Sequence, residues 1–280
     1  MQEAVERAIA TMWHRYDEPL TLADIADTAI LSKFYFSRVF RTLTGTSPSR
    51  FLAAVRLCMA KKLLLETSES VTDISFRVGY NSLGTFTSRF TRSVGVPPAR
   101  FRMMSELGMS ALPRALRPSG PPAHRGGTYG EVSVPDTDLP IRIYVAAFKE
   151  SIPEGQPRSC DILEEPGAFR LAGLPDGQWF VRVAVVPSRP IEPRPWVRQP
   201  LFIGATREPV VIRNGAPVET DILTRPFCAF DIPILLALPE LDGRPSYPAN
   251  GLSVAASGTW NGPQVNAADQ VAGSPFQSRA

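Results

Sequence analysis

Histidine and cysteine are scarce in this chain of 280 residues, which contains two histidines and three cysteines. Cys58, Cys160 and Cys228 are too few and too far apart for a disulfide framework or a zinc cluster, which favours a reducing, cytoplasmic setting. A catalytic triad needs a histidine base, and neither His14 nor His124, which lies in a linker-like segment, supplies one. The sequence also has no Walker A loop and no dinucleotide-binding glycine motif. We expect no enzyme, no metal and no cofactor.

Long apolar runs are also missing. No stretch approaches the roughly 18–20 apolar residues that a membrane-spanning helix needs. The N-terminus carries Glu3 and Glu6 and has no apolar core of an export signal. We therefore expect a cytoplasmic protein that does not associate with membranes.

Charge and proline are distributed unevenly along the chain. Residues 1–120 hold 16 Lys and Arg against 10 Asp and Glu, whereas residues 121–280 hold 14 against 17. Only 6 of the 28 prolines lie in the first part, and proline removes helix hydrogen bonds. The sequence predicts a multidomain protein with a basic all-α N-terminal domain and an acidic all-β C-terminal domain. The basic part is the one expected to meet a polyanion.

The N-terminal domain contains an internal repeat. Phenylalanines, glycines and prolines recur at one offset of 50 residues: Phe36 and Phe86, Phe40 and Phe90, Gly45 and Gly95, Pro48 and Pro98, and Phe51 and Phe101. A single offset across several residue types marks two copies of one supersecondary unit. Two copies are too few for a solenoid.

Each copy is predicted to contain two helices separated by a short turn. In the first copy, Thr21 is placed to cap a short helix, and a second helix runs from Ser32 to a stop at Gly45. In the second copy, Ser82 caps the second helix, and Leu83 is expected to face the core. A short helix left exposed after such a turn is typical of helix-turn-helix units, which place it in the DNA major groove.

The outward faces of these second helices carry small polar and basic side chains. Between Asp27 and Glu66 there are seven Lys and Arg and no acid, a composition that favours DNA phosphates through counterion release. Arg38 and Arg41 are one turn apart, as expected for reading guanine edges. Helix N-termini at Ser32 and Ser82 are expected to offer N–H groups to phosphates. The predicted DNA-binding residues are Ser32, Lys33, Phe34, Ser37, Arg38, Arg41, Ser82, Gly84, Thr85, Ser88, Arg89 and Arg92.

Several of these residues, and two lysines of the following helix, have a second interpretation. Phe34 either lies exposed toward DNA or closes the core beside Tyr35. Arg92 is either a base reader or a solvated charge at a helix end. Lys61 and Lys62 either contact phosphate or form a solvated face. Amphipathic helix pairs alone indicate only packing, so the repeat and the acid-free basic segment carry the interpretation.

Residues 5–102 resemble the DNA-binding domain of AraC/XylS-type transcription regulators. The resemblance is carried by YFSRVFRTLTGTSPSRF (35–51), by the linker helix within 53–80, and by FTSRFTRSVGVPPARFR (86–102). It implies two helix-turn-helix units joined by a rigid helix and inserted in successive major grooves, about 34 Å apart. The chain departs from the family in two respects. The DNA-binding part comes first rather than last, and the counterpart of Arg38 in the second copy is Ser88, with Arg89 beside it.

The remainder is predicted to form a linker (106–127), a β-sandwich-like domain (128–256) and a disordered tail (257–280). Residues 167–183 resemble the signature of carboxypeptidase-regulatory or transthyretin-like domains. The apolar stretch Phe227–Leu238 is expected to pack as a strand or short helix, with a subunit contact as one option. The expected strands are Tyr129–Val134, Ile141–Phe148, Ala168–Leu171, Gln178–Val186, Val210–Arg213 and Val218–Leu223.

Taken together, these features predict a sequence-specific transcription regulator that binds double-stranded DNA. RNA polymerase, a small-molecule effector and a second copy of the chain are its other expected partners, with the β-domain sensing the effector or forming a homodimer. One alternative is a DNA-repair or other enzyme with the same DNA-binding domain. Cys160 beside Asp161 is a poor thiolate for that chemistry. The other alternative is a DNA-binding protein of architectural type without sequence choice.

Overall fold

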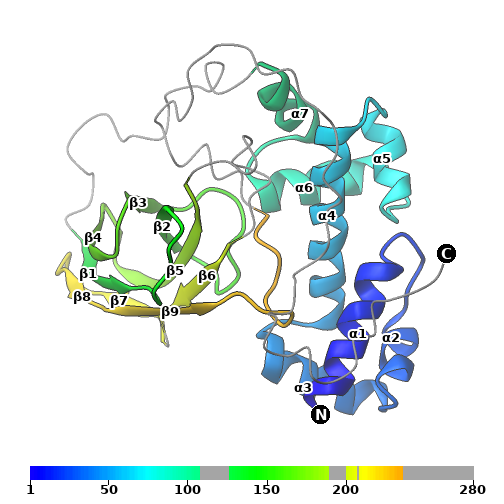
Figure 1. Cartoon of the computed structure of the whole chain (residues 1–280), viewed down its shortest axis with the longest axis horizontal. Helices are drawn as coiled ribbons and strands as arrows, with labels where there is room; N and C mark the ends of the chain where they lie inside the picture. The colour runs from blue at the N-terminus through cyan, green and yellow to red at the C-terminus, as the bar shows by residue number, and fades with distance from the viewer. Residues whose placement is uncertain (108–125, 189–199, 207, 236–280) are drawn as a thin grey trace.

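The chain folds into a helical part followed by a β-rich part, as the proline distribution predicts. A computed structural model describes residues 1–107, 126–188, 200–206 and 208–235. The helices lie on one side of the molecule and the strands on the other (Figure 1). The predicted tail and nearly all of the predicted linker lie outside the described residues. No helix in the described ranges combines the length and apolar character that crossing a membrane requires.

The helical part contains two helix-turn-helix units around one long central helix. Figure 1 places α2 and α3 around one end of α4, and α5 and α6 around the other. A helix of 19 residues such as α4 is about 28 Å long, close to one turn of B-DNA. In chain order the helices are α1 (Gln2–His14), α2 (Leu22–Thr28), α3 (Lys33–Thr44), α4 (Pro48–Glu66), α5 (Val71–Arg77), α6 (Leu83–Val94) and α7 (Pro98–Leu107).

The ends of the helices follow the capping chemistry of the sequence. Thr21 caps α2 as expected, and Asp24 completes a reciprocal capping box with it. The Ser82 hydroxyl accepts a hydrogen bond from the Thr85 N–H at 3.1 Å, whereas Ser32 occupies the N-cap of α3 without a side-chain hydrogen bond. Helices α3 and α6 both end at a glycine in the left-handed conformation.

The 50-residue repeat reappears in three dimensions as two phenylalanine triads. Ring centroids are 5.4 Å apart for Phe36 and Phe40, and 5.5 Å apart for Phe40 and Phe51. The counterpart pairs in the second unit, Phe86–Phe90 and Phe90–Phe101, are 5.6 and 5.7 Å apart. All six rings are fully buried. Each triad fixes a second helix against the helix that follows it (α4 or α7).

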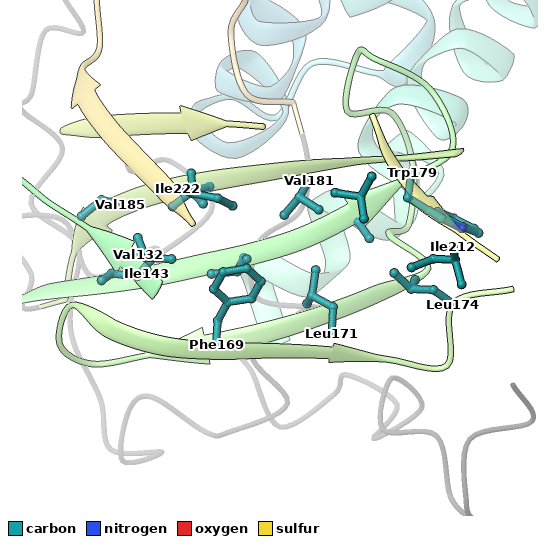
Figure 2. Close-up of a cluster of buried hydrophobic side chains, with 14 of the residues drawn as sticks. Val132, Ile143, Phe169, Leu171, Leu174, Trp179, Val181, Val185, Ile212 and Ile222 are labelled. Carbon is teal, nitrogen blue, oxygen red and sulfur yellow. The ribbon is translucent and has the colours of Figure 1, made fainter. Parts of the chain in front are cut away.

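The β-rich part forms a rolled sheet around one apolar core. Strand order along the main path is β3-β2-β5-β6-β9-β1-β4, with β7 beside β5 and β8 beside β1. Figure 2 shows side chains from these strands meeting inside the roll, including Val132, Phe169 and Trp179. The strands are β1 (Gly127–Ser133), β2 (Ile141–Phe148), β3 (Ser159–Leu163), β4 (Gly167–Ala172), β5 (Gly177–Pro187), β6 (Phe202–Ala205), β7 (Val210–Ile212), β8 (Val218–Glu219) and β9 (Ile222–Pro226).

Two of these strands, β3 and β6, have no counterpart among the predicted segments. Asp161 interrupts the apolar pattern of β3, but its carboxylate accepts hydrogen bonds from the N–H groups of Ile162 and Arg170, each at 2.9 Å. This carboxylate joins β3 to β4 across the two ends of the strand path. The nine described strands belong to one sheet by their pairing, and the predicted sandwich-like arrangement stays a prediction.

The helical and β-rich parts are packed together through an apolar segment after β9. Residues 227–235 form neither the strand nor the short helix that was expected. Phe230 and Ile232 pack against the core of the first helix-turn-helix unit, and Leu235 is buried in that of the second. Ile234 packs in the opposite direction, against Tyr144 and its neighbours on the sheet. This apolar stretch thus makes an intramolecular contact.

The turns of the two units differ at one strained position. Ile30, after α2, has a φ of 57°, which is costly for a β-branched residue, and its side chain is 83% exposed. Gly79 occupies the corresponding turn after α5 with a φ of 81°. In both turns, the next N–H bonds to a carbonyl five residues back. The first unit thus keeps a strained isoleucine where the second has glycine.

We expect Ile30→Gly to stabilise the helical part by about 1 kcal/mol, because relief of left-handed strain exceeds the entropic cost of glycine and little burial is lost. Urea unfolding followed by the helical circular-dichroism signal measures this change. Gly79→Ala is the matched control and should destabilise, since its Cβ would lie 3.0 Å from Arg56 Cζ and from the Asp17 carbonyl oxygen. Lower stability for Ile30→Gly would contradict the strain.

Candidate nucleic-acid interface

Helix α3 presents a basic and aromatic face to solvent. Lys33, Phe34, Arg38 and Arg41 are all exposed, and Phe34 has an exposed fraction of 79%, so it does not close the core. The buried face of the same helix carries Phe36 and Phe40. The pattern places these four predicted DNA-binding residues of α3 away from the core.

Local cation–π contacts order part of this face. The Lys33 Nζ atom lies 5.2 Å from the centroid of the Phe34 ring, and Arg38 Cζ lies 5.3 Å from that of Tyr35. Exposed contacts of this kind are worth about 0.5–1 kcal/mol, which restrains a side chain without locking it. Within the described ranges, neither Arg38 nor Arg41 forms an ion pair with a carboxylate. Their charges therefore remain available to an anionic partner.

The other cations of the acid-free segment are engaged inside the protein. Arg56 donates through Nε and Nη2 to the carbonyl oxygens of Tyr16 and Glu18, both at 2.7 Å, and burial lowers the pKa of this guanidinium. Lys62 lies 3.9 Å from a Glu66 carboxylate oxygen. Of the seven cations, Lys33, Arg38 and Arg41 make up the outward charge of α3.

Lys61 was expected to contact phosphate or to form a solvated face, and the structure shows that both expectations were wrong. Its side chain is 7% exposed, at the contact between α4 and α7, with Nζ 5.6 Å from the centroid of the Phe101 ring. Burial lowers the pKa of Lys61 to about 8. Helical periodicity could have indicated this, because Lys61 lies between the buried Leu57 and Leu64 on α4.

Helix α6 exposes smaller side chains than α3. Gly84, Thr85, Ser88 and Arg89 are exposed, whereas Leu83, predicted to face the core, is 38% exposed. The prediction that Leu83 faces the core was wrong, since this first residue of α6 lies at the surface. Ser37, on α3, is half-buried, and the caps Ser32 and Ser82 are exposed.

Arg92, at the end of α6, is tied to the β-rich part. Its Nε lies 3.0 Å from one oxygen of Glu154, and Arg50 Nη2 lies 3.1 Å from the other. The neighbouring Gly155 N–H donates to the carbonyl oxygen of Ser93 at 3.2 Å. One carboxylate on the loop between β2 and β3 thus bridges the start of α4 and the end of α6. Sequence reasoning missed Glu154, because no local pattern links residues so far apart.

Comparison with known proteins gives matches to the helical part. A helix-turn-helix domain family model matches residues 25–104. The uncharacterized HTH-type transcriptional regulator YobQ of Bacillus subtilis is 36% identical over 95 residues, which cover 34% of this chain and 39% of that protein. The bifunctional transcriptional activator/DNA repair enzyme AdaA of the same organism is 34% identical over 92 residues, covering 33% and 44%. The chain therefore spans less than half the length of these two relatives.

A solved structure also matches this part of the chain. It is a transcriptional regulator from Chromobacterium violaceum, described as an AraC-type DNA-binding domain-containing protein. It is 30% identical, with a TM-score of 0.34, and the match covers 37% of this chain and 93% of that one.

We expect Lys61→Met to flatten the pH dependence of stability above pH 8. With a folded pKa of about 8, the unfolded chain binds a proton that the folded chain lacks between about pH 8 and 10.5, so stability rises with pH there. The variant should lose a rise in the free energy of unfolding of roughly 1–3 kcal/mol over this pH range, as measured by urea unfolding. Lys62→Met is the control and should keep the wild-type profile. If DNA binding by Lys61→Met depended less on salt than that of the wild type, Lys61 would contact phosphate after all, which would contradict its burial.

Proposed function

Because residues 25–104 form an AraC-type helix-turn-helix domain, we propose that the protein is a sequence-specific, DNA-binding transcription regulator. It inserts α3 and α6 into adjacent major grooves of double-stranded DNA. The observation that carries the proposal is the free face of α3, where Phe34, Arg38 and Arg41 are exposed and no described carboxylate pairs with either arginine. The length of α4 supports two contacts about one turn apart.

An enzymatic alternative finds little support in the thiols. All three cysteines are free, and burial raises the pKa of each. For Cys58 it rises to about 11, and for Cys160 the charge of Asp161 raises it further. A nucleophilic cysteine needs the opposite shift. In the described ranges, no group of His, Cys, Asp or Glu side chains could hold a metal ion. The pKa shifts of the thiols favour a regulator over a repair enzyme that uses a reactive cysteine.

The β-rich part is proposed to regulate DNA binding through its contact with the helices. Glu154 holds Arg50 and Arg92, two cations beside the DNA-binding helices, and residues 227–235 fill the space between the two parts. A small molecule or a second copy of the chain that bound this β-domain would act on α6 through this contact.

Selection of duplexes from a random pool with the full chain tests the proposed function. We expect one motif to be enriched, and Arg38→Ala to lose roughly 1–3 kcal/mol of discrimination at one base pair. Arg213→Ala removes an exposed arginine of the β-rich part and should keep wild-type discrimination. Equal affinity of the wild-type chain for selected and scrambled duplexes would favour an architectural DNA-binding protein instead.

Glu154→Gln should strengthen DNA binding of the full chain about two- to tenfold at low salt. The change frees Arg50 and Arg92 while keeping the shape of the side chain, and exposed ion pairs of this kind are worth 0.2–1 kcal/mol each. Fluorescence anisotropy at several salt concentrations measures the change, which should shrink as salt rises. Glu150→Gln, the same charge change at an exposed neighbour, is the control. Equal effects of both variants would exclude a regulatory role for this contact.

A further inference from the structure

The two second helices are equivalent position by position, which allows their outward faces to be compared directly. Helices α3 and α6 each have 12 residues, each follows a serine N-cap, and each ends at a left-handed glycine. Their buried phenylalanines are related by the same 50-residue offset. A residue on α3 and the residue 50 positions later therefore face the same direction in their own unit.

The outward faces differ sharply in reach and charge. Helix α3 exposes two arginines, a lysine and a phenylalanine, whereas the same positions of α6 carry one aliphatic residue, one glycine and two hydroxyl residues. The equivalent pairs are Lys33 and Leu83, Phe34 and Gly84, Arg38 and Ser88, and Arg41 and Thr91. The face of α6 that corresponds to the basic face of α3 is therefore uncharged.

The arginines of α6 lie elsewhere on the helix. Arg89 and Arg92 are one position beyond Ser88 and Thr91, which turns them by about 100° around the helix axis. The counterpart of Arg89 in the first unit is Val39, which packs against the core. Burial raises the pKa of the Tyr80 phenol, and the charge of the nearby Arg89 offsets part of that rise, while Arg92 is paired with Glu154.

Gly84 also indicates that α6 does not present long side chains to its partner. A Cβ atom at this position would have no heavy atom within 4 Å, so nothing inside the protein requires glycine there. Its backbone does not adopt a positive φ. Glycine has a lower helix propensity than alanine, and here no internal contact compensates for it. The absence of a side chain leaves the backbone of α6 free to approach a partner closely.

We propose that α3 carries the base discrimination of this protein and that α6 binds its groove through backbone and phosphate contacts with little sequence preference. The proposal rests on the proposed DNA-binding function. A long side chain such as Arg38 can form bidentate hydrogen bonds to O6 and N7 of guanine, whereas short hydroxyl side chains contact phosphates or several bases alike. The DNA site should therefore have one half whose base sequence determines affinity (the read half) and one half that tolerates base changes (the permissive half).

Substituting each base pair of a selected site in turn tests this proposal. With the full chain, we expect changes in one half to weaken binding at least tenfold and changes in the other half to weaken it less than threefold. Arg38→Ala should abolish discrimination at one position of the read half. Ser88→Ala should leave discrimination unchanged throughout. Equal sensitivity of the two halves, or a loss in Ser88→Ala comparable to that in Arg38→Ala, would overturn the proposal.

A gain of discrimination provides the complementary test. Ser88→Arg restores the α3 pattern on α6 and should create a new preference for guanine, tenfold or more, in the permissive half. Ser49→Arg adds the same charge at an exposed position of α4 and should strengthen binding to all sequences equally. The absence of a new preference in Ser88→Arg would count against the proposal. Failure to enrich any site would instead refute the proposed function itself.

Discussion

The burial of two phenylalanine triads is the constraint on which the helical part depends. Phe36, Phe40 and Phe51 bind α3 to α4, and Phe86, Phe90 and Phe101 bind α6 to α7. Truncating one such ring in a core typically costs 3–5 kcal/mol, a large fraction of the stability of a domain. Since each triad takes one face of its helix, the opposite face is left to solvent. The exposed arginines of α3 are a consequence of that packing.

The β-rich part is attached to this arrangement at two places of different chemistry. Residues 227–235 contribute apolar side chains to the helical cores and to the sheet. Salt does not screen this apolar contact. Glu154 contributes charge at the surface, where salt weakens it. The apolar contact therefore holds the two parts together, while the polar contact is the one that an anionic partner such as DNA can compete with.

Much of the helical part follows from local sequence signals. Helical periodicity, the Thr21 cap and the glycine stops predict α2, α3 and α6, and the 50-residue offset predicts that two units share one design. Other features depend on contacts between distant residues. Leu83 is exposed although it shares the periodicity of the buried face, Lys61 is buried where α7 covers α4, and β3 forms by pairing with β2. The docking of residues 227–235 likewise needs both parts to be folded.

Hydroxyl-radical footprinting of the full chain on a selected duplex tests whether α3 and α6 occupy adjacent major grooves, because it reports where both helices meet the DNA backbone. We expect two protected windows on one side of the duplex, with centres about one helical turn apart. Arg38→Ala should weaken the window over α3 more than the one over α6. A single protected window, or two windows on opposite sides of the duplex, would contradict the placement of α3 and α6 in adjacent major grooves.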